Sequence, residues 1–169
     1  MFLVTDRKII LKGERVSLVE MLDEDQPIFH KWHSENEELL RLIDCDDVPT
    51  MEDQLKWYAR SAQPDRRMFS IVLSKGELIG HGGFVDIGKE EKTAQLRITI
   101  GPPKYWGKGL GTEATNLIIQ YGFEQMDLSD IWLRVRMDNE RAIKAYEKLK
   151  FSRGELEDGG KILHMHLAK

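Results

Sequence analysis

The sequence of 169 residues has a single cysteine and no long run of apolar residues. Cys45 has no second cysteine for an intramolecular disulfide or a zinc site, which suits a protein of the reducing cytoplasm. The apolar run Met1–Val4 is interrupted at once by Thr5 and Asp6, so it is too short for the apolar core of a signal peptide. Nothing elsewhere approaches a membrane span. The sequence therefore predicts a cytoplasmic protein without a membrane segment.

The chain also lacks internal repeats, low-complexity stretches and linkers rich in proline, glycine or serine. Its apolar fraction of 41% and charged fraction of 32% are those of an ordinary globular protein. The length is sufficient for one hydrophobic core and short for two. We therefore expect residues 1–169 to form one domain.

No basic stripe runs along the whole chain, and the net charge is −4. The segment 20–53 has twelve acidic residues and only two basic ones, so the remainder of the chain carries an excess of positive charge. This segregation argues against a general nucleic-acid binder and lets the two regions attract different ligands. Solvated helix faces are the simpler explanation for any single charge.

The spacing of apolar residues predicts the secondary structure. Strands are expected over residues 15–19, 69–73, 78–87, 92–100, 131–136, 151–156 and 162–167. Helices are expected to begin near Asp23 and Thr50, each with a capping-box partner three residues on, after the glycines at 107–111, and at Asn139. The order β-α-α-β-β-β-α-β-α-β-β is that of a mixed α/β (α+β) domain. Its sheet is mostly antiparallel, flanked by helices, with one strand–helix–strand crossover.

The strongest motif is residues 105–112, YWGKGLGT, between a predicted strand and a predicted helix. Three alternating glycines let the backbone turn tightly and approach a ligand. The first turn of the helix offers free N–H groups and the positive end of its dipole, so together they predict an anion site suited to a diphosphate. The spacing G-x-G-x-G is neither the dinucleotide fingerprint nor the P-loop. A plain turn is the alternative for a glycine-rich segment taken alone.

The segment Leu96–Phe151 resembles the cofactor-binding half of the GNAT N-acetyltransferase superfamily, most specifically in Trp106–Thr112 and Asn139–Phe151. The stretches Leu11–Val16 and Leu78–His81 are similar to its ribosomal-protein and spermidine acetyltransferase branch. The resemblance covers most of the chain. It implies a single GNAT-like domain that uses acetyl-CoA as a co-substrate and holds no metal.

The same resemblance implies which residues contact CoA. Amides of the glycine-rich loop hold the diphosphate, and the pantetheine arm runs beside the preceding strand. The implied residues are the backbone of Ile98, Thr99 and Ile100, the loop residues Trp106, Gly107, Lys108, Gly109, Leu110, Gly111 and Thr112, and Asn139. The loop departs from the family pattern where it opens, because Trp106 stands in place of the usual Gln or Arg. This change removes a polar side-chain contact but leaves the amides.

Asn139 and Tyr146 are seven residues apart on one predicted helix, so they share a face, about 10.5 Å apart along the axis. The resemblance assigns Asn139 to a contact with CoA and Tyr146 to the general acid that protonates the departing thiolate. A phenol with a pKa of about 10 can supply that proton at neutral pH. The simpler roles are an N-cap for Asn139 and core packing for Tyr146. Their combination with the phosphate loop favours the functional roles.

Arg141, Lys144 and Lys148 form a basic stripe on the same predicted helix. With Lys108 they are candidates for contacts to the 3′-phosphate of CoA. A solvated helix face is the simpler explanation for each of them.

The attacking amine must lose a proton, because a lysine-like amine has a pKa of about 10.4 and is almost fully protonated at pH 7. Residues 95–100 offer no acid as an obvious base. Glu113 is explained by its place in the first turn of a helix. His81 is expected to be a structural histidine with satisfied hydrogen bonds. The sequence assigns no general base.

The acidic segment falls where helices help to wall the acceptor site in this superfamily. We expect its carboxylates to attract a cationic acceptor, such as a polyamine or a basic peptide N-terminus. The candidates are Glu35, Glu37, Glu38, Asp44, Asp46 and Asp47.

The predicted function is N-acetyltransfer from acetyl-CoA to a primary amine, by direct attack in a ternary complex. The acceptor is expected to be a polyamine, a peptide or protein N-terminus, or a similar small amine. Two alternatives stay open: a CoA- or acyl-CoA-binding sensor without turnover, and an antitoxin-like or scaffold protein that uses the acidic helices. No nucleic-acid or membrane partner is expected, and a homo-oligomer is compatible with the sequence.

Overall fold

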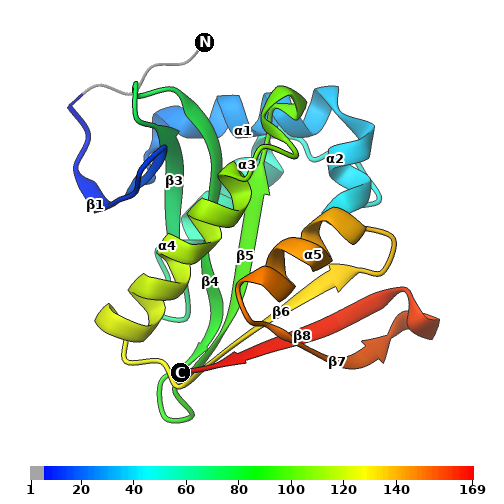
Figure 1. Cartoon of the computed structure of the whole chain (residues 1–169). Helices are drawn as coiled ribbons and strands as arrows, with labels where there is room; N and C mark the ends of the chain where they lie inside the picture. The colour runs from blue at the N-terminus through cyan, green and yellow to red at the C-terminus, as the bar shows by residue number, and fades with distance from the viewer. Residues whose placement is uncertain (1–5) are drawn as a thin grey trace.

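The computed structural model describes residues 6–169 and is built on one sheet of eight strands (Figure 1). The run Met1–Val4 lies outside the described residues. The strands are β1 (Ile9–Lys12), β2 (Val16–Glu20), β3 (Arg67–Leu73), β4 (Leu78–Gly88), β5 (Thr93–Ile100), β6 (Asp130–Arg136), β7 (Ser152–Glu157) and β8 (Ile162–Ala168). Their spatial order is β1-β2-β3-β4-β5-β6-β8-β7. Every neighbouring pair is antiparallel except β5 and β6, which are parallel and joined by a crossover helix.

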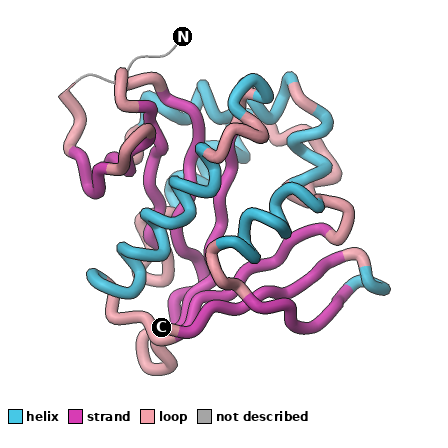
Figure 2. The backbone as a smooth tube through the Cα atoms, viewed as in Figure 1, coloured by secondary structure: helices cyan, strands magenta, loops and turns pink. Residues whose placement is uncertain are grey.

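Helices cover both faces of this sheet (Figure 2). They are α1 (Gln26–Glu35), α2 (Glu37–Leu42), α3 (Met51–Arg60), α4 (Leu110–Gln125) and α5 (Glu140–Lys148), with short 3-10 turns at Asp23–Asp25, Pro103–Tyr105 and Asp158–Gly160. Helices α4 and α5 lie on one face, and α1 to α3 lie on the other. The mixed fold predicted from the sequence is therefore confirmed.

Two apolar clusters fix these two layers. Buried side chains of α4 and α5 pack on the inner strands in the larger cluster, which includes Ala114, Ile118, Ile143, Phe69, Phe84 and Leu133. The smaller cluster joins α1 to the opposite face through Phe29, Met68, Val72, Leu78 and Val85, with Trp32 and Trp57 packed against it. Both faces of the sheet are therefore packed against helices.

The structure adds two elements that the pattern did not predict. Strand β1 has four residues and pairs only with β2, so its alternation is too short to stand out. Helix α2 is a six-residue helix separated from α1 by Asn36, whose extended backbone breaks the helix and whose Oδ1 accepts the N–H of Leu39 at 3.0 Å. Short elements of this kind carry too few turns for periodicity to identify them.

One predicted cap is confirmed and another is wrong. Thr50 and Asp53 form the full capping box of α3, with the N–H of Asp53 3.1 Å from Thr50 Oγ1 and the N–H of Thr50 2.9 Å from Asp53 Oδ2. Asp23 instead begins a 3-10 turn, and α1 starts at Gln26. The carboxylate that organises this turn is that of buried Asp25, which accepts from Arg7 at 2.6 Å and Ser70 at 2.6 Å.

The parallel strands β5 and β6 pair over three residues only. The paired positions on β5 are Thr93, Ala94 and Gln95, and the last of them lies opposite Trp132. Beyond this point the two strands diverge, as Figure 1 shows, while β5 continues to Ile100. The divergence opens the sheet between its two faces and exposes one edge of β5.

Candidate active site

A cavity of about 870 Å³ lies at this divergence. On one face it is lined by the glycine-rich loop and α5, and on the other by α1, the 39–54 segment and Trp57 of α3. Backbone and side chains of β5 from Gln95 to Ile100 lie between these two parts. The cavity therefore reaches both faces of the sheet, so two different molecules could meet inside it.

The glycine-rich loop turns in the left-handed region at two of its glycines. Gly107 has φ 70° and Gly109 has φ 79°, values that side-chain-bearing residues adopt only with strain. The first N–H with an intrahelical acceptor is that of Glu113, 3.0 Å from the carbonyl oxygen of Gly109. The N–H groups of the first turn of α4 are therefore free for an anion, and the helix dipole favours one there.

A salt bridge holds this loop against the β1–β2 turn. Arg15 Nε lies 2.9 Å from Glu113 Oε2, and the Arg15 guanidinium donates to the carbonyl oxygen of Lys108 at 2.9 Å. Glu113 Oε1 also accepts the N–H groups of Arg15 and Val16, at 2.7 and 3.1 Å. Burial acts to raise the pKa of Glu113, but these hydrogen bonds and the guanidinium outweigh it and lower the pKa. Glu113 is thus a bound carboxylate that positions the loop, not a free base.

Trp106 provides a polar contact at the opening of the loop. Its indole N–H donates to the carbonyl oxygen of Ile100 at 2.7 Å, and the Arg141 guanidinium carbon lies 4.8 Å from the centre of its ring. The departure from the family pattern therefore replaces one side-chain contact with another, which ties the loop to β5 and to α5.

The exposed edge of β5 presents two of the three predicted backbone positions to the cavity. Peptide groups along a strand alternate between its two sides. The N–H of Gly101 bonds the carbonyl oxygen of Ile79 on β4, so the peptide groups of Ile98 and Ile100 face the divergence. The backbone of Thr99 instead pairs with His81 on β4, and only its side chain can serve the site.

Most of the predicted cofactor residues come together in this cavity. Its lining includes Ile98, Thr99, Ile100, Trp106, Gly107, Gly109, Gly111, Thr112, Asn139 and Tyr146. Lys108 and Leu110 do not line it, because the Lys108 carbonyl binds Arg15 and the Leu110 side chain is buried in the core. These two residues could contribute only their N–H groups.

Tyr146 lies on α5 and is the candidate acid. Burial raises the pKa of Tyr146 to about 12, so its phenol stays protonated at neutral pH. The ring meets Phe151 edge to face, with centroids 5.7 Å apart, which fixes its orientation. Asn139 is the N-cap of the same helix, since its Oδ1 accepts the N–H of Ala142 at 3.3 Å. The capping role of Asn139 is therefore confirmed, and a contact with CoA stays a prediction.

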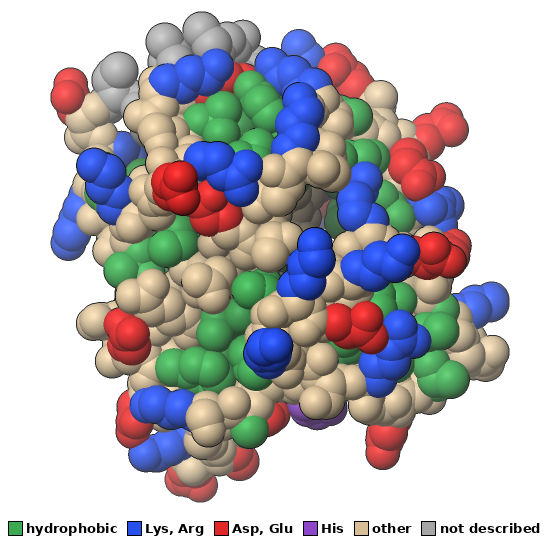
Figure 3. Space-filling model, viewed as in Figure 1, with side chains coloured by type: hydrophobic (Ala, Val, Ile, Leu, Met, Phe, Trp, Pro, Cys, Tyr) green, Lys and Arg blue, Asp and Glu red, His purple; other side chains and the backbone are tan. Residues whose placement is uncertain are grey.

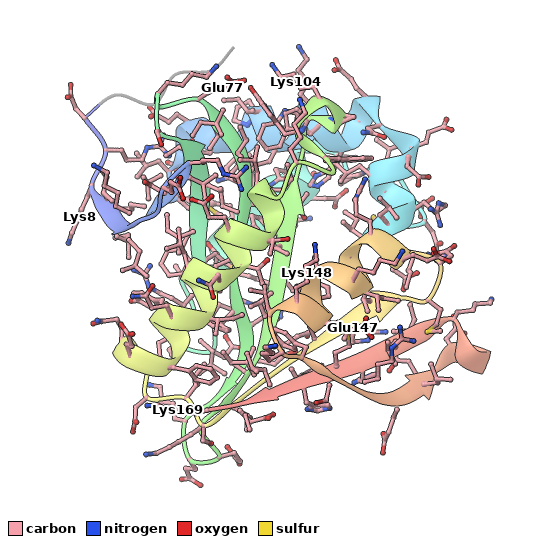
Figure 4. All side chains as sticks on the ribbon, in the orientation of Figure 1. Lys8, Glu77, Lys104, Glu147, Lys148 and Lys169 are labelled. Atoms are coloured by element: carbon pink, nitrogen blue, oxygen red, sulfur yellow. The ribbon has the colours of Figure 1, made fainter. Side chains whose placement is uncertain are left out.

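Basic side chains of α5 line one side of the cavity. Arg141, Lys144 and Lys148 line it, and Figure 3 shows Lys and Arg side chains around a hollow between α4 and α5. In Figure 4 Lys148 lies toward the gap between these helices, whereas Glu147 lies on the other side and accepts from Arg153 at 2.7 Å. The predicted stripe thus faces the cavity.

The opposite side of the cavity holds two buried histidines. His81 and His33 have ring centroids 6.1 Å apart, and neither ring has a hydrogen-bond partner within residues 6–169. Burial, together with nearby His33, lowers the pKa of His81 to about 3, so His81 is neutral. The expectation that His81 has satisfied hydrogen bonds is therefore wrong. It packs instead against Phe29 and Trp57.

The predicted acidic wall is largely absent from the lining. Of the six carboxylates expected to attract a cation, only Asp44 lines the cavity, and it is 3.2 Å from Arg136. Glu38 is bound to Arg41 at 2.7 Å. Three arginines that the sequence analysis did not single out, Arg97, Arg134 and Arg136, line it instead. Their alternation on β5 and β6 was visible in the sequence, but not their convergence.

Two features are absent from the described part of the chain, a cluster of metal ligands and a membrane-spanning helix. Between residues 6 and 169, no three His, Cys, Asp or Glu side chains are grouped so as to hold a metal ion. In the same range no helix is long and apolar enough to span a membrane. The expected absence of a metal and the cytoplasmic location stay predictions.

Comparison with known proteins identifies the family. Residues 15–152 match the family model described as an acetyltransferase (GNAT) domain. Spermidine N(1)-acetyltransferase of Escherichia coli (strain K12) is 34% identical over 148 residues, covering 86% of this chain and 73% of that protein. Alpha/beta-tubulin-N-acetyltransferase 9 of Mus musculus is 24% identical over 86% of this chain and 65% of its own length.

A solved structure agrees with this match. Spermidine N-acetyltransferase from Vibrio cholerae, crystallised in complex with CoA and spermine, superposes with a TM-score of 0.84 at 20% identity, over 92% of this chain and 96% of that one. The predicted resemblance and the predicted class of enzyme, an acetyl-CoA-dependent N-acetyltransferase, are both confirmed. The chain belongs to the GNAT acetyltransferase family.

Proposed function

We propose that this protein transfers an acetyl group from acetyl-CoA to a primary amine by direct attack within one ternary complex. The observation that carries the proposal is the cavity at the divergence of β5 and β6, whose lining joins a diphosphate-type loop on one face of the sheet to α1, the 39–54 segment and Trp57 on the other. When bound, acetyl-CoA supplies the acetyl group as a thioester, and its transfer forms an amide and releases the CoA thiol.

The residues of this chain fit such a cofactor. The free N–H groups of the first turn of α4 match a diphosphate, and Arg141, Lys144 and Lys148 are placed for further phosphate contacts. The N–H groups of Ile98 and Ile100 and the carbonyl group of Ile98 face the cavity and match the amides of a pantetheine arm, whereas the Ile100 carbonyl accepts the Trp106 indole N–H. In this arrangement the N–H of Ile98 stabilises negative charge on the acyl oxygen.

Tyr146 supplies the proton for the departing sulfur. Its phenol lines the cavity and is held protonated by burial, with a pKa of about 12. A group that is fully protonated at neutral pH can donate a hydrogen bond or a proton to a thiolate as charge develops on it. Most of the rate enhancement comes from holding the amine and the thioester in attack geometry.

The amine loses its proton to water or enters as the rare neutral form. Both carboxylates in the lining already have partners, Asp44 with Arg136 and Asp53 with Thr50. His81 is neutral but too weakly basic to hold a proton at pH 7. The chain therefore contributes no strong base among its described cavity residues.

Relatives support an amine acceptor and an oligomer. The names of the Escherichia coli relative and of the Vibrio cholerae structure specify spermidine, and the latter complex contains spermine. Another Vibrio cholerae structure, with a TM-score of 0.74, is described as dodecameric. We accordingly propose a primary amine as acceptor and a homo-oligomer in solution.

One assay tests the proposal against its rival. The purified chain is incubated with radiolabelled acetyl-CoA and a panel of primary amines, and CoA binding is measured by calorimetry. Acetylated amine is expected. Tight CoA binding without transfer to any amine would instead support a CoA sensor, and neither binding nor transfer would support a scaffold.

A further inference from the structure

The cavity is strongly positive in a chain that is negative overall. Its charged lining consists of the cations Arg97, Arg134, Arg136, Arg141, Lys144 and Lys148 and the carboxylates Asp44 and Asp53. The net charge of the whole chain is −4. A lining that opposes the overall charge in this way concentrates anions in the cavity.

These cations form two sets on opposite faces of the sheet. Arg141, Lys144 and Lys148 project from α5 on the cofactor face. Arg97 alternates with buried Leu96, and Arg134 with buried Leu133, both of which pack toward α4 and α5. The side chains of Arg97, Arg134 and Arg136 therefore lie on the other face. We call the part of the cavity on that face its mouth, and these three residues the mouth arginines. CoA bound on the α5 side leaves these three cations unused.

The mouth arginines differ in their partners. Arg134 binds Glu157, and Arg136 binds Asp138 and Asp44. Arg97 has neither a hydrogen bond nor an ion pair with any side chain of residues 6–169, and the position opposite it on β4 is Gly83, which has no side chain. Burial lowers the pKa of Arg97, and Arg66, Arg134 and Arg60 lower it further, whereas Asp86 acts the other way. Its positive charge is thus incompletely compensated.

Arg97 is also well placed for an acceptor. It lies on β5 two residues beyond Gln95, where pairing with β6 ends, and next to Ile98, whose peptide group faces the cavity. Because Arg97 is on a paired strand, its backbone is fixed in place. Its guanidinium can bind a carboxylate or a phosphate through two parallel hydrogen bonds.

From this placement we propose that the acceptor is a primary amine that also carries an anionic group, a carboxylate or a phosphate, and that Arg97 binds this group while the amine points to the thioester. The inference rests on the proposed acetyl transfer and specifies the substrate class. Arg97 is a specificity residue in this scheme, and it takes no part in the bond changes.

A polyamine fits this mouth poorly. A second ammonium group of a polyamine would lie near Arg97, and both carboxylates of the cavity lining, Asp44 and Asp53, already have partners. Asp86, which also acts on Arg97, does not line the cavity. Like charges brought together in a partly buried site oppose binding. The charge of the mouth therefore selects against the acceptor named for the relatives.

Three amines with the same propyl chain test the inference: 3-aminopropyl phosphate, 3-aminopropanol and 1,3-diaminopropane. They share the reacting amine and the chain and differ in the terminal group, which is anionic, neutral or cationic. Acetylation is expected in the order phosphate, hydroxyl, ammonium, with kcat/KM about 10- to 100-fold higher for the phosphate than for the alcohol. 4-Aminobutanoate, compared with the phosphate, shows which anion is preferred.

Variants of Arg97 test whether this residue causes the preference for the anionic amine. In Arg97→Gln the ratio of kcat/KM for phosphate over alcohol is expected to fall to near one, and Arg97→Lys to restore part of it. Lys12→Gln, which removes one positive charge from the exposed strand β1, is expected to keep the ratio of the unmodified protein. Binding of 3-aminopropyl phosphate to the CoA-saturated protein, measured by calorimetry, should weaken in Arg97→Gln alone.

The outcomes separate the inference from the function on which it rests. Faster acetylation of 1,3-diaminopropane or spermidine than of the phosphate overturns the inference and leaves acetyl transfer intact. An unchanged ratio in Arg97→Gln overturns it as well. Without transfer to any amine, the proposed function fails, and the calorimetric comparison still decides whether Arg97 binds the anion.

Discussion

The indole N–H of Trp106 donates a hydrogen bond of 2.7 Å to the carbonyl oxygen of Ile100, the last residue of β5. This contact joins the opening of the glycine-rich loop to the strand whose edge faces the cavity. Since the Arg141 guanidinium lies over the same indole ring, one side chain connects the three elements expected to hold CoA. It explains how the loop keeps its place with an aromatic residue at its opening.

Loss of this hydrogen bond is expected to weaken CoA binding. Trp106→Phe keeps an aromatic ring for Arg141 but removes the donor to Ile100, a loss worth about 1 kcal/mol. We expect the Kd for CoA to rise about 3- to 10-fold, measured by calorimetry. Trp132→Phe, outside the cavity lining, serves as the control. Equal effects of the two substitutions would contradict a specific role for Trp106.

Two glycines with similar backbone angles allow a matched test of the loop. Gly109 has φ 79° and opens α4, whereas Gly159 has φ 62° in the β7–β8 turn. Gly109→Ala and Gly159→Ala should each lower the free energy of unfolding by about 1 kcal/mol, measured by urea denaturation. Only Gly109→Ala should weaken CoA binding, by at least about tenfold. A comparable loss in Gly159→Ala would mean that the effect is one of stability.

Tyr146→Phe tests the proton donor. The substitution keeps the ring that packs on Phe151 and removes the hydroxyl, so kcat should fall about 10²- to 10⁴-fold while the Kd for CoA changes less than about threefold. Because the pKa of Tyr146 is about 12, kcat of the unmodified protein should show no loss from its ionisation up to pH 10. Tyr58→Phe on α3 is the control. Unchanged kcat in Tyr146→Phe would remove it from the mechanism.

Glu113→Gln distinguishes a positioning carboxylate from a base. The substitution weakens the bonds to Arg15 and Val16, so we expect a loss of about 1–3 kcal/mol in the free energy of unfolding and weaker CoA binding. The shape of the pH profile of kcat/KM should not change. Disappearance of its acidic limb in this variant would show that Glu113 is the base after all.

The buried histidine predicts a loss of stability in acid. The pKa of His81 is about 3 in the folded protein and about 6.5 when unfolded, so below pH 6.5 the unfolded chain binds a proton that the folded chain does not. Stability therefore falls as the pH drops from 6.5 toward 3. Between pH 7 and 5 this group removes about 2 kcal/mol.

Urea denaturation at pH 7 and at pH 5 measures this loss in the free energy of unfolding. His81→Phe, which suits the contacts with Phe29 and Trp57, should reduce the difference between the two pH values by about that amount. His81→Gln gives the same comparison with a polar side chain that has no ring and does not titrate. If both variants keep the full acid sensitivity, another group is responsible.

The sequence alone predicted most of the elements and most of the residues that line the α5 side of the cavity. Apolar patterns and turn signals predicted seven of the strands, and the chemistry of glycine and of helix N-termini predicted the loop at 107–111, because these signals arise from residues close together in the chain. Capping signals were equally local: Thr50 and Asp53 act as predicted. Asp23 did not, because a buried partner for Asp25 redirected the turn.

Only the tertiary structure decided which charged side chains line the cavity on the face opposite α5. The carboxylates of segment 20–53 are exposed or paired, while Arg97 and Arg134, far apart in the sequence, come together where β5 and β6 diverge. Among the described residues the ring of His81 has no hydrogen-bond partner, and Glu113 is bound by Arg15. Both properties likewise depend on residues distant in the chain. Local spacing encodes backbone geometry, but the charge of a cavity depends on which side chains the packed layers bring together and which they pair off.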